Sequence, residues 1–376
     1  LVVVGRGDPQ RVSSEADSLA DLRRWAHLVA QLGIREVRGD LVGDDRYFAG
    51  PMRLADWPKQ QWHRWYSAPC GALNLNDNCF DVTIAGNGES IVTSVFPETG
   101  LVTVDNQLTP VKDAKRHVYS IDRTPGSWTV VLRGRFLNPR SPLTEWVTIE
   151  DPTLAYVGAL RYLLEESGVR VTGDVRRGAA PPDARLVDRV AHSIASYVPR
   201  LIKKSMNLHG DCLLRHFGRR GGSDGSFVQS AMAAESLLKE RFGWNGPITM
   251  RDGSGLSHQN RINARDVVTL LRTVEDKPWG SILIDALPVA GKDGTLARRF
   301  RRSSVAGRVR AKTGHISGVT SLVGYLDTKA GRVTFAVLFN GPRSKVGKAD
   351  RWHETLLEAV DASVAADSAA GRRGVK

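Results

Sequence analysis

The sequence contains little cysteine, and its 376 residues include no long hydrophobic run. No apolar stretch approaches the ~20 residues that a membrane-spanning helix needs, and the mean hydropathy is −0.26. Three cysteines are too few for a disulfide scaffold. The nine histidines are scattered, and no Cys/His cluster has the spacing of a zinc site. We therefore predict a chain without a disulfide framework, without a structural metal and without a transmembrane span.

The few cysteines leave the pairing of any single disulfide open. Cys70 and Cys79 are near enough in sequence to close a short loop in an oxidising compartment, which would leave Cys212 free. Three cysteines permit three pairings, and the sequence does not choose among them.

Acidic residues are outnumbered by basic ones. The chain has 53 Lys and Arg against 40 Asp and Glu, a net charge of +13 and a pI of about 9.9. The chain lacks aromatic-rich platforms for single strands and any recognition-helix motif, which argues against a nucleic-acid binder. Two interpretations remain for the densest basic patch, a solvated face or an anion site beside Lys312. The patch consists of Arg298, Arg299, Arg301, Arg302, Arg308, Arg310 and Lys312.

The first half of the chain is predicted to hold two helices with short strands between them. Apolar residues recur at three-and-four spacing over residues 17–32, and Gly33 ends this helix. Asp151 followed by Pro152 predicts the cap and first turn of a second helix, which we expect to reach Gly168. The expected strands are residues 80–84, 90–96, 127–132 and 146–149.

The second half is predicted to be helical first and β-rich at its end. A Gly/Ala/Pro-rich segment at 178–183 suggests a domain boundary. The expected helices and strands are helices 195–217, 226–242 and 263–273, then strands 316–326 and 333–339.

The triplet Lys312-Thr313-Gly314 is the most informative motif. It follows the alternating Val309 and Ala311, which predicts an edge strand that presents a cation, a hydroxyl and a bare backbone to one ligand. Such a triplet also occurs by chance as a turn after a strand. Its weight therefore depends on the rest of the chain.

A second motif, Ser205-Met206-Asn207, lies upstream in a predicted helix. A serine hydroxyl can relay a proton, and an asparagine amide can bind a peptide group. Ser-x-Asn alone is also compatible with an ordinary helix start, so it too depends on its context.

Together these motifs resemble those of class C low-molecular-mass penicillin-binding proteins, the D-alanyl-D-alanine carboxypeptidases/endopeptidases. Further segments resemble this family in the same order along nearly the whole chain. The resembling segments are residues 5–9, 66–69, 74–81, 201–215, 251–257, 287–291, 293–296, 312–314 and 335–341.

The resemblance implies a role for each motif residue. Lys312 would bind the terminal carboxylate of the substrate, and Thr313 would donate its hydroxyl to the same group. Gly314 would let the substrate backbone lie flat against the strand. Ser205 would relay a proton, and Asn207 would bind the substrate amide from the other side of the cleft.

The family's nucleophile motif, Ser-x-x-Lys, does not occur where the resemblance requires it. Its one occurrence, Ser236 to Lys239, follows Ser205 instead of preceding it and lies on a predicted amphipathic helix, so we interpret it as a helix face. The chain opens at Leu1 as if inside a strand. We expect a fragment that lacks the nucleophile. The alternative is a catalytically inactive homologue that acts as a binding or scaffold protein.

Two further residues receive weaker interpretations. Asp44 lies where the resemblance places an acidic residue facing the side-chain amine of the substrate, although an aspartate that only stabilises a turn is an alternative of at least the same weight. Ser254, in Asp252-Gly253-Ser254-Gly255, lacks the Gly-x-Ser-x-Gly frame of a nucleophile elbow, so we interpret it as a structural turn residue.

The resemblance implies a mixed α/β (α+β) fold, in which a β-lactamase/transpeptidase-like catalytic domain with an antiparallel sheet is interrupted by inserted β-rich domains. We assign residues 1–183 to the inserted part, 184–360 to the C-terminal catalytic part and 361–376 to a flexible tail. The implied function is a serine-type D-Ala-D-Ala carboxypeptidase or endopeptidase, without cofactor or metal. It would act on peptidoglycan stem peptides through an acyl-enzyme that β-lactams trap. The implied location is periplasmic or extracytoplasmic, with a signal peptide lost in the missing part.

Overall fold

The structure is a computed structural model that describes residues 1–9, 17–112, 117–137 and 140–369. The chain divides into two compact units. Unit 1 contains residues 1–192 and 207–230, and unit 2 contains residues 193–206 and 231–376. The division into three parts made from the sequence stays a prediction.

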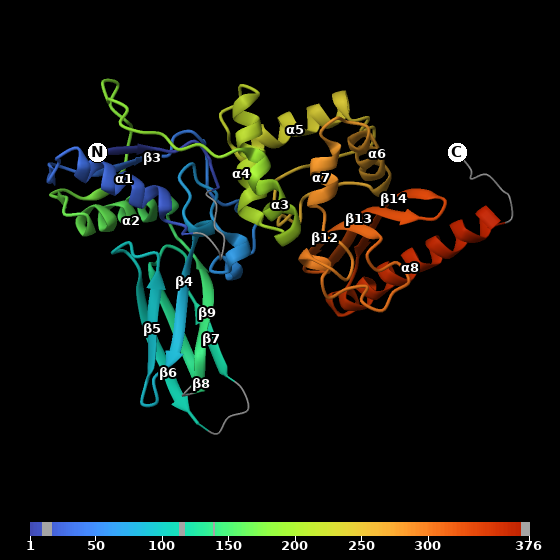
Figure 1. Ribbon diagram of the computed structural model, residues 1–376, viewed down its shortest axis with the longest axis horizontal. Coiled ribbons are helices and arrows are strands. Elements are labelled where there is room, and N and C mark those ends of the chain that lie inside the picture. The colour runs from blue at the N-terminus through green and yellow to red at the C-terminus, as the bar shows by residue number, and fades with distance from the viewer. Residues whose placement is uncertain (10–16, 113–116, 138–139, 370–376) are drawn as a thin grey trace. The chain divides into compact units, whose positions relative to one another are not determined.

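Unit 1 begins with an α/β module (Figure 1). Its three-stranded parallel sheet has the order β1-β3-β11, and helices α1 and α2 pack their apolar sides into one core with it. The elements are β1 (Val2–Val4), α1 (Ala20–Gln31), β3 (Leu41–Asp44), α2 (Pro152–Glu166) and β11 (Val175–Arg177), with a small parallel pair of β2 (Glu36–Val37) and β10 (Arg170–Val171).

The start of α2 confirms the cap expected from the sequence. The Asp151 carboxylate accepts hydrogen bonds from the backbone N–H groups of Thr153 and Leu154, at 3.0 and 3.1 Å. Pro152 occupies the first turn, where its missing N–H has no partner to lose. Local sequence therefore fixes where this helix begins.

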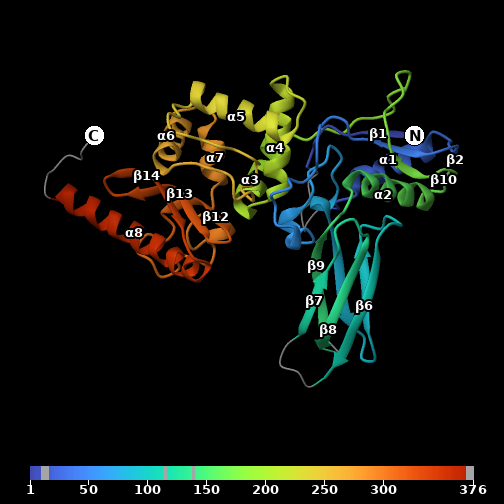
Figure 2. The ribbon, with the colours of Figure 1, turned by 180° about the vertical axis from the view of Figure 1, so that it is seen from behind.

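Residues 79–148 of unit 1 form a module of two β-sheets, whose strands extend away from the α/β module (Figures 1 and 2). One sheet has the antiparallel order β5-β4-β9, and the other has the order β6-β8-β7. Alternate residues of both sheets enter one core that includes Val82, Ile84, Val130 and Leu132. The strands are β4 (Cys79–Gly86), β5 (Ile91–Phe96), β6 (Thr103–Val111), β7 (Val118–Asp122), β8 (Thr129–Leu137) and β9 (Arg140–Thr148).

The four strands expected in this module fall on β4, β5, β8 and β9, whereas β6 and β7 were not predicted. Strand β6 has the sequence TVDNQLTPV and is mostly exposed. Because a strand at a sheet edge needs no apolar alternation on both sides, its sequence carries little periodic signal.

The remaining elements of unit 1 lie around helix α4 (Asn207–Arg220). Three short 3₁₀ turns precede it in the chain: η1 (Lys59–Gln61), η2 (Trp65–Ser67) and η3 (Asn76–Asn78). The η3 residues all have positive φ near 50°, a conformation that Asn and Asp adopt more readily than other side chains.

Unit 2 is built on an antiparallel sheet of order β12-β13-β14. Helix α8 lies along one face of this sheet, and α6 and α7 cover the other (Figure 1). Strand β12 is at the edge, as the sequence predicts. The elements are α3 (Ile194–Lys204), α6 (Ala264–Glu275), α7 (Gly280–Ala286), η4 (Gly294–Leu296), β12 (Val309–Ile316), β13 (Val319–Thr328), β14 (Gly331–Asn340) and α8 (Arg343–Ala369), while α5 (Phe227–Arg241) begins in unit 1 and ends in unit 2.

The single helix predicted over 195–217 is wrong in one respect. The chain forms two helices there, α3 and α4, because Ser205 adopts the left-handed conformation with φ 58° and ψ 50°. Serine rarely adopts this conformation, so the break could not be predicted from the residue type.

Helix α8 extends further than expected. It runs to Ala369 and so includes residues 361–369 of the segment predicted as a flexible tail. Alanine is the strongest helix former, and Leu357 and Val360 of the preceding turns pack against the sheet core. Residues 370–376 lie outside the described residues.

Candidate active site

The site is centred on the Lys312 side chain, at the edge strand of unit 2. Lys312 is the Cα partner of Val323 on β13, so both side chains emerge on the sheet face that packs against α6 and α7. Its Nζ donates hydrogen bonds to the Ser205 Oγ at 2.8 Å and to the Thr313 carbonyl at 2.6 Å. The structure thus brings two of the predicted site residues into contact.

The partners of the Lys312 ammonium in the described residues are both uncharged. Within the described part of the chain no carboxylate pairs with it, and burial lowers its pKa to about 8. A desolvated ammonium without a carboxylate gains most from an anionic ligand, because low local dielectric strengthens the attraction. The arrangement is that of an anion anchor.

Ser205 reaches Lys312 because of the helix break. It ends α3, and its backbone N–H donates to the carbonyl of Leu201. The left-handed turn redirects the chain at this residue and leaves the hydroxyl beside the ammonium. A serine that stays in this conformation is held there by the surrounding packing, a pattern common at functional sites.

A clamp holds the end of α3 in place. Lys203 donates to the Leu287 carbonyl at 2.9 Å and to the Asp293 carboxylate at 2.6 Å. The other Asp293 oxygen accepts from the Val289 N–H at 2.8 Å. Burial tends to raise the pKa of Asp293, but these bonds outweigh it and the pKa is lowered. The segment 287–296 is therefore tied to the residues just before Ser205.

Gly294 belongs to this clamp. Its φ is +54°, and a Cβ there would lie 2.7 Å from the Lys203 carbonyl. Only glycine combines that backbone conformation with such a close approach.

The residues after Lys312 also have specific neighbours. The Thr313 hydroxyl donates to the Thr295 hydroxyl at 2.8 Å. Gly314 lies opposite Ser321 of β13, and a Cβ on Gly314 would lie 2.4 Å from the Ser321 Oγ. The structure thus supplies a reason for this glycine within the protein itself: it makes room for a hydroxyl on the neighbouring strand.

Asn207 and Asp44 belong to unit 1 and are described by their own contacts. Asn207 begins α4, and its Nδ2 donates to the Tyr66 carbonyl at 2.8 Å. Asp44 ends β3, and its carboxylate accepts from Arg46 at 2.8 and 2.9 Å and from the Ala180 N–H at 2.9 Å. Their proposed contacts with a substrate stay predictions.

The Asp44 carboxylate is already well satisfied. The side chain is 7% exposed, and its pKa is lowered to about 2, chiefly by the hydrogen bond from Arg46. A substrate amine would therefore have to share this carboxylate with the guanidinium of Arg46.

Ser236 and Ser254, which were not interpreted as nucleophiles from the sequence, lie in a helix and in a turn. Ser236 and Lys239 are exposed on α5. Ser254 lies in a turn organised by Asp252, whose carboxylate accepts from the N–H groups of Gly255 and Ser257.

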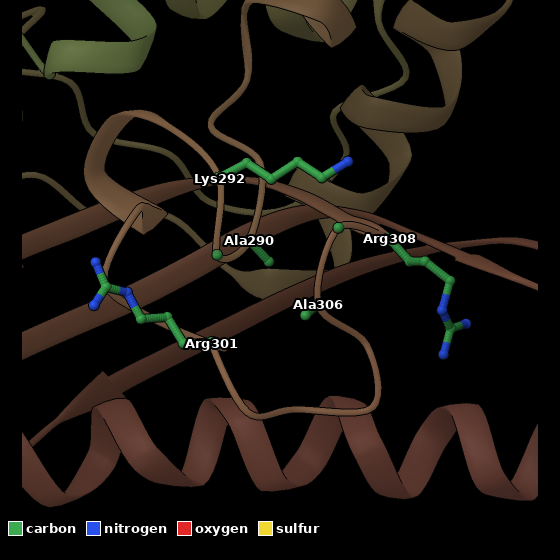
Figure 3. A pocket seen from close by; sticks show the side chains of 7 residues that line it. Ala290, Lys292, Arg301, Ala306 and Arg308 are labelled. Atoms are coloured by element: carbon green, nitrogen blue, oxygen red, sulfur yellow. The ribbon is translucent and has the colours of Figure 1, made fainter.

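Some arginines of the basic patch form ion pairs, and others line a surface pocket. Arg299 pairs with Asp350 and Glu354, and Arg308 pairs with Asp361. A pocket of about 400 Å³ lies beside them, lined by Ala290, Gly291, Lys292, Arg301, Ala306, Gly307 and Arg308. Figure 3 shows its three basic side chains pointing away from one another. This divergence favours the solvated face over a focused anion site in this part of the patch.

Sequence reasoning missed the residues that position the motif. Lys203, Asp293 and Thr295 lie in resembling segments and Ser321 lies outside them, and none of the four had an assigned role. Their signal was weak because each acts through a partner distant in the sequence. The conspicuous Asp293-Gly294-Thr295 segment was the best available clue.

Comparison with known proteins agrees with this geometry. Residues 1–359 match the D-Ala-D-Ala carboxypeptidase 3 (S13) family. The chain belongs to this family. The resemblance inferred from the motifs is thereby confirmed at the level of the family.

Individual S13 relatives cover the chain almost completely. A D-alanyl-D-alanine carboxypeptidase of an Actinomadura species is 31% identical over 358 residues, which are 91% of this chain. The chain spans 65% of the length of that enzyme. The D-alanyl-D-alanine carboxypeptidase DacB of Haemophilus influenzae is 25% identical over 91% of this chain and 72% of its own length.

The fold is also that of a solved S13-like structure. Penicillin-binding protein 4 of Haemophilus influenzae superposes with a TM-score of 0.76 over 90% of this chain and 76% of that chain, at 23% identity. The mixed α/β architecture with several sheets expected from the sequence is therefore confirmed.

Two kinds of feature are absent from the described residues. No helix there combines the length and apolar character required to cross a bilayer. No cluster of three or more His, Cys, Asp and Glu side chains there is arranged to hold a metal ion.

Proposed function

We propose that this protein is a serine-type D-Ala-D-Ala carboxypeptidase or endopeptidase that acts on peptidoglycan stem peptides. The observation that carries the proposal is the Lys312 ammonium on an edge strand: it is partly buried, no carboxylate of the described residues pairs with it, and it lies 2.8 Å from the Ser205 hydroxyl. A stem peptide ends in a free carboxylate, which is the group such an ammonium binds best. The activity named for the S13 relatives supports the same substrate class.

The proposed chemistry divides the work between the residues of the site. Lys312 binds the terminal carboxylate, and the Thr313 hydroxyl, which donates to Thr295 in this structure, turns its proton to that carboxylate when the substrate binds. The scissile carbonyl then lies against the edge strand, where an acyl-enzyme forms on a nucleophilic serine and the terminal D-alanine leaves. Ser205 relays the proton that the leaving amine needs. Asn207 binds the substrate amide, and Asp44 contacts its side-chain amine.

β-Lactams are the proposed inhibitors, because their carboxylate and strained amide mimic the same peptide end. The Haemophilus influenzae penicillin-binding protein 4 has been solved in complex with a β-lactam, which supports this proposal. The location that fits such substrates is outside the cytoplasmic membrane, in the periplasm or cell wall.

The test uses the gene product that carries this sequence. We expect it to release D-alanine from a stem pentapeptide and to be labelled covalently by a fluorescent penicillin. Lys312→Ala is expected to lower the acylation rate constant at least about 30-fold, because losing a desolvated charge partner costs about 2 kcal/mol or more. Lys329→Ala, which removes an exposed lysine from the turn between β13 and β14, is the matched control and should acylate normally.

Unchanged acylation by Lys312→Ala would contradict the anchor role. A second function, that of a non-catalytic binding protein, is favoured by one observation: within residues 1–376 the spacing Ser-x-x-Lys occurs only on the exposed face of α5. If neither D-alanine release nor labelling occurs, but stem peptide binds and Lys312→Ala abolishes that binding, the second function replaces the first.

A further inference from the structure

Two of the three cysteines lie side by side in unit 1. The Sγ atoms of Cys70 and Cys212 are 3.3 Å apart, although the residues are 142 positions apart in sequence. Cys70 follows η2, and Cys212 lies in the second turn of α4. All three cysteines are free thiols and buried. No sulfur contact to Cys79 occurs among the described residues, so the structure distinguishes one of the three pairings.

The backbone on both sides of this contact is held by other bonds. The Cys70 N–H donates to the Met52 carbonyl at 2.8 Å, and its own carbonyl accepts from Arg215 at 2.7 Å. Arg215 is 1% exposed and lies one turn after Cys212 on α4. The Cys212 sulfur also accepts from the Asn74 amide at 3.6 Å. The two thiols are therefore held next to each other by contacts that do not depend on a covalent bond.

We propose that Cys70 and Cys212 form a disulfide that joins the segment after η2 to helix α4. A disulfide has an S–S length of about 2.05 Å, so the sulfurs need to approach by roughly 1.2 Å. Disulfides persist outside the cytoplasm. Formation of the bond in the cell therefore requires the extracytoplasmic location given in the proposed function. In vitro it requires only an oxidising redox buffer.

The oxidant is a disulfide of low molecular mass, such as glutathione disulfide. One cysteine thiolate attacks it, forms a mixed disulfide and releases one glutathione thiol. The second cysteine thiolate attacks the protein sulfur of that mixed disulfide and releases the second glutathione. Two thiol protons leave, and the two electrons reduce the oxidant to two thiols.

The reaction belongs to the folding chain. In the folded protein Cys70 and Cys212 are 0% and 1% exposed, and burial raises the pKa of Cys212 well above its usual value. A glutathione molecule does not reach them there, and Cys212 stays protonated. The bond therefore forms while the segments are still accessible and is then protected from reduction.

The experiment refolds the full chain in a buffer of reduced and oxidised glutathione and blocks free thiols with iodoacetamide. We expect digestion and mass spectrometry to find Cys70 linked to Cys212 and Cys79 alkylated. Alkylation of all three cysteines at the most oxidising ratio would overturn the proposal. So would a predominant link that includes Cys79.

Matched variants test the consequence for stability. A cross-link over 142 residues restricts the unfolded chain, so a reductant present during refolding should lower the Tm of the wild type by several degrees. Cys79→Ala should keep this dependence on reductant, and Cys70→Ser and Cys212→Ser should lose it. A Tm of the wild type that is independent of reductant would overturn the proposal. None of these readouts uses peptidase activity, so they stand apart from a failure of the proposed function.

Discussion

Lys312 places the requirements of binding and of stability in opposition. Its ammonium is partly buried beside a hydroxyl and a carbonyl, and no carboxylate in the described part of the chain neutralises it. Removing a charge from water is unfavourable unless it is paired. The same desolvation that prepares this residue for an anion therefore weakens the fold while the site is empty.

Replacing Lys312 with methionine is expected to stabilise the protein near pH 7. The pKa of Lys312 is lowered from 10.5 to about 8 by burial, which corresponds to roughly 1–3 kcal/mol of destabilisation while the group is charged. The linear methionine side chain fills similar space without that charge. Urea unfolding of Lys312→Met and wild type measures the difference, and a variant less stable than wild type at pH 7 would contradict this account.

The pH dependence of that difference has a defined sign. Between about pH 8 and pH 10.5 the unfolded chain keeps a proton that the folded protein has released, so the stability of the wild type rises with pH in this window. The advantage of Lys312→Met should therefore shrink from pH 8 upward. Over the same range the affinity for a carboxylate ligand should fall, because Lys312 loses its charge.

At the scale of elements, the break between α3 and α4 decides the site. The periodicity over 195–217 is continuous, and it predicts one helix. The left-handed conformation of Ser205 interrupts that helix, and the clamp of Lys203 with Asp293 fixes the end of α3. The partner of Lys203 in the clamp lies 90 residues away in the sequence, so the residues around Ser205 do not by themselves reveal the break.

Two substitutions at Ser205 are expected to distinguish the effect of losing the hydroxyl from the effect of backbone strain on stability. Ser205→Ala and Ser205→Gly both remove the hydrogen bond to Lys312, but only glycine is unstrained at φ 58°. We expect Ser205→Gly to be more stable than Ser205→Ala by about 1 kcal/mol, measured by urea unfolding. Both variants should lose the proton relay to the same degree.

The control for this pair is the same exchange at a regular helical position. At Ala233, inside α5, Ala→Gly should instead destabilise by about 1 kcal/mol. If Ser205→Gly proves no more stable than Ser205→Ala, the backbone at residue 205 is not strained in solution and this prediction is wrong.

At the scale of the whole molecule, the charge balance governs behaviour in acid. The net charge of +13 includes the negative charges of all carboxylates, several of which pair with arginines, such as Asp44 with Arg46 and Asp361 with Arg308. These hydrogen bonds lower the pKa values of both carboxyl groups, that of Asp44 to about 2. Protonating them removes the pairs and raises the positive charge of the molecule.

The protein is therefore expected to lose stability steeply in acid. For a carboxyl group with a lowered folded-state pKa, the unfolded chain binds the proton first, so the stabilisation is complete above about pH 4 and declines as pH falls toward about 2. Thermal melts from pH 6 to pH 2 test this. Asp44→Asn should be less stable than wild type at pH 6, and the two should converge toward pH 2. A constant difference would contradict the assignment.

The sequence by itself determined the local parts of this protein. The cap at Asp151, the edge strand that carries Lys312 and the strands with alternating apolar residues follow from interactions within a few residues. The ordered motifs also indicated the family, which the match over residues 1–359 confirms. Strand β6 was not predicted, because most of its residues are exposed and its sequence alternates weakly; β7, also not predicted, is only five residues long.

Only the tertiary structure decided which distant residues meet. Ser205 and Lys312 are 107 positions apart, and Cys70 and Cys212 are 142 apart. Such contacts arise from packing over whole units, where the entropy of closing long loops is offset by buried surface far from the pair itself. Residue spacing therefore cannot encode them, and the cation, the hydroxyl and the two thiols each acquire a partner only when the core around them has formed.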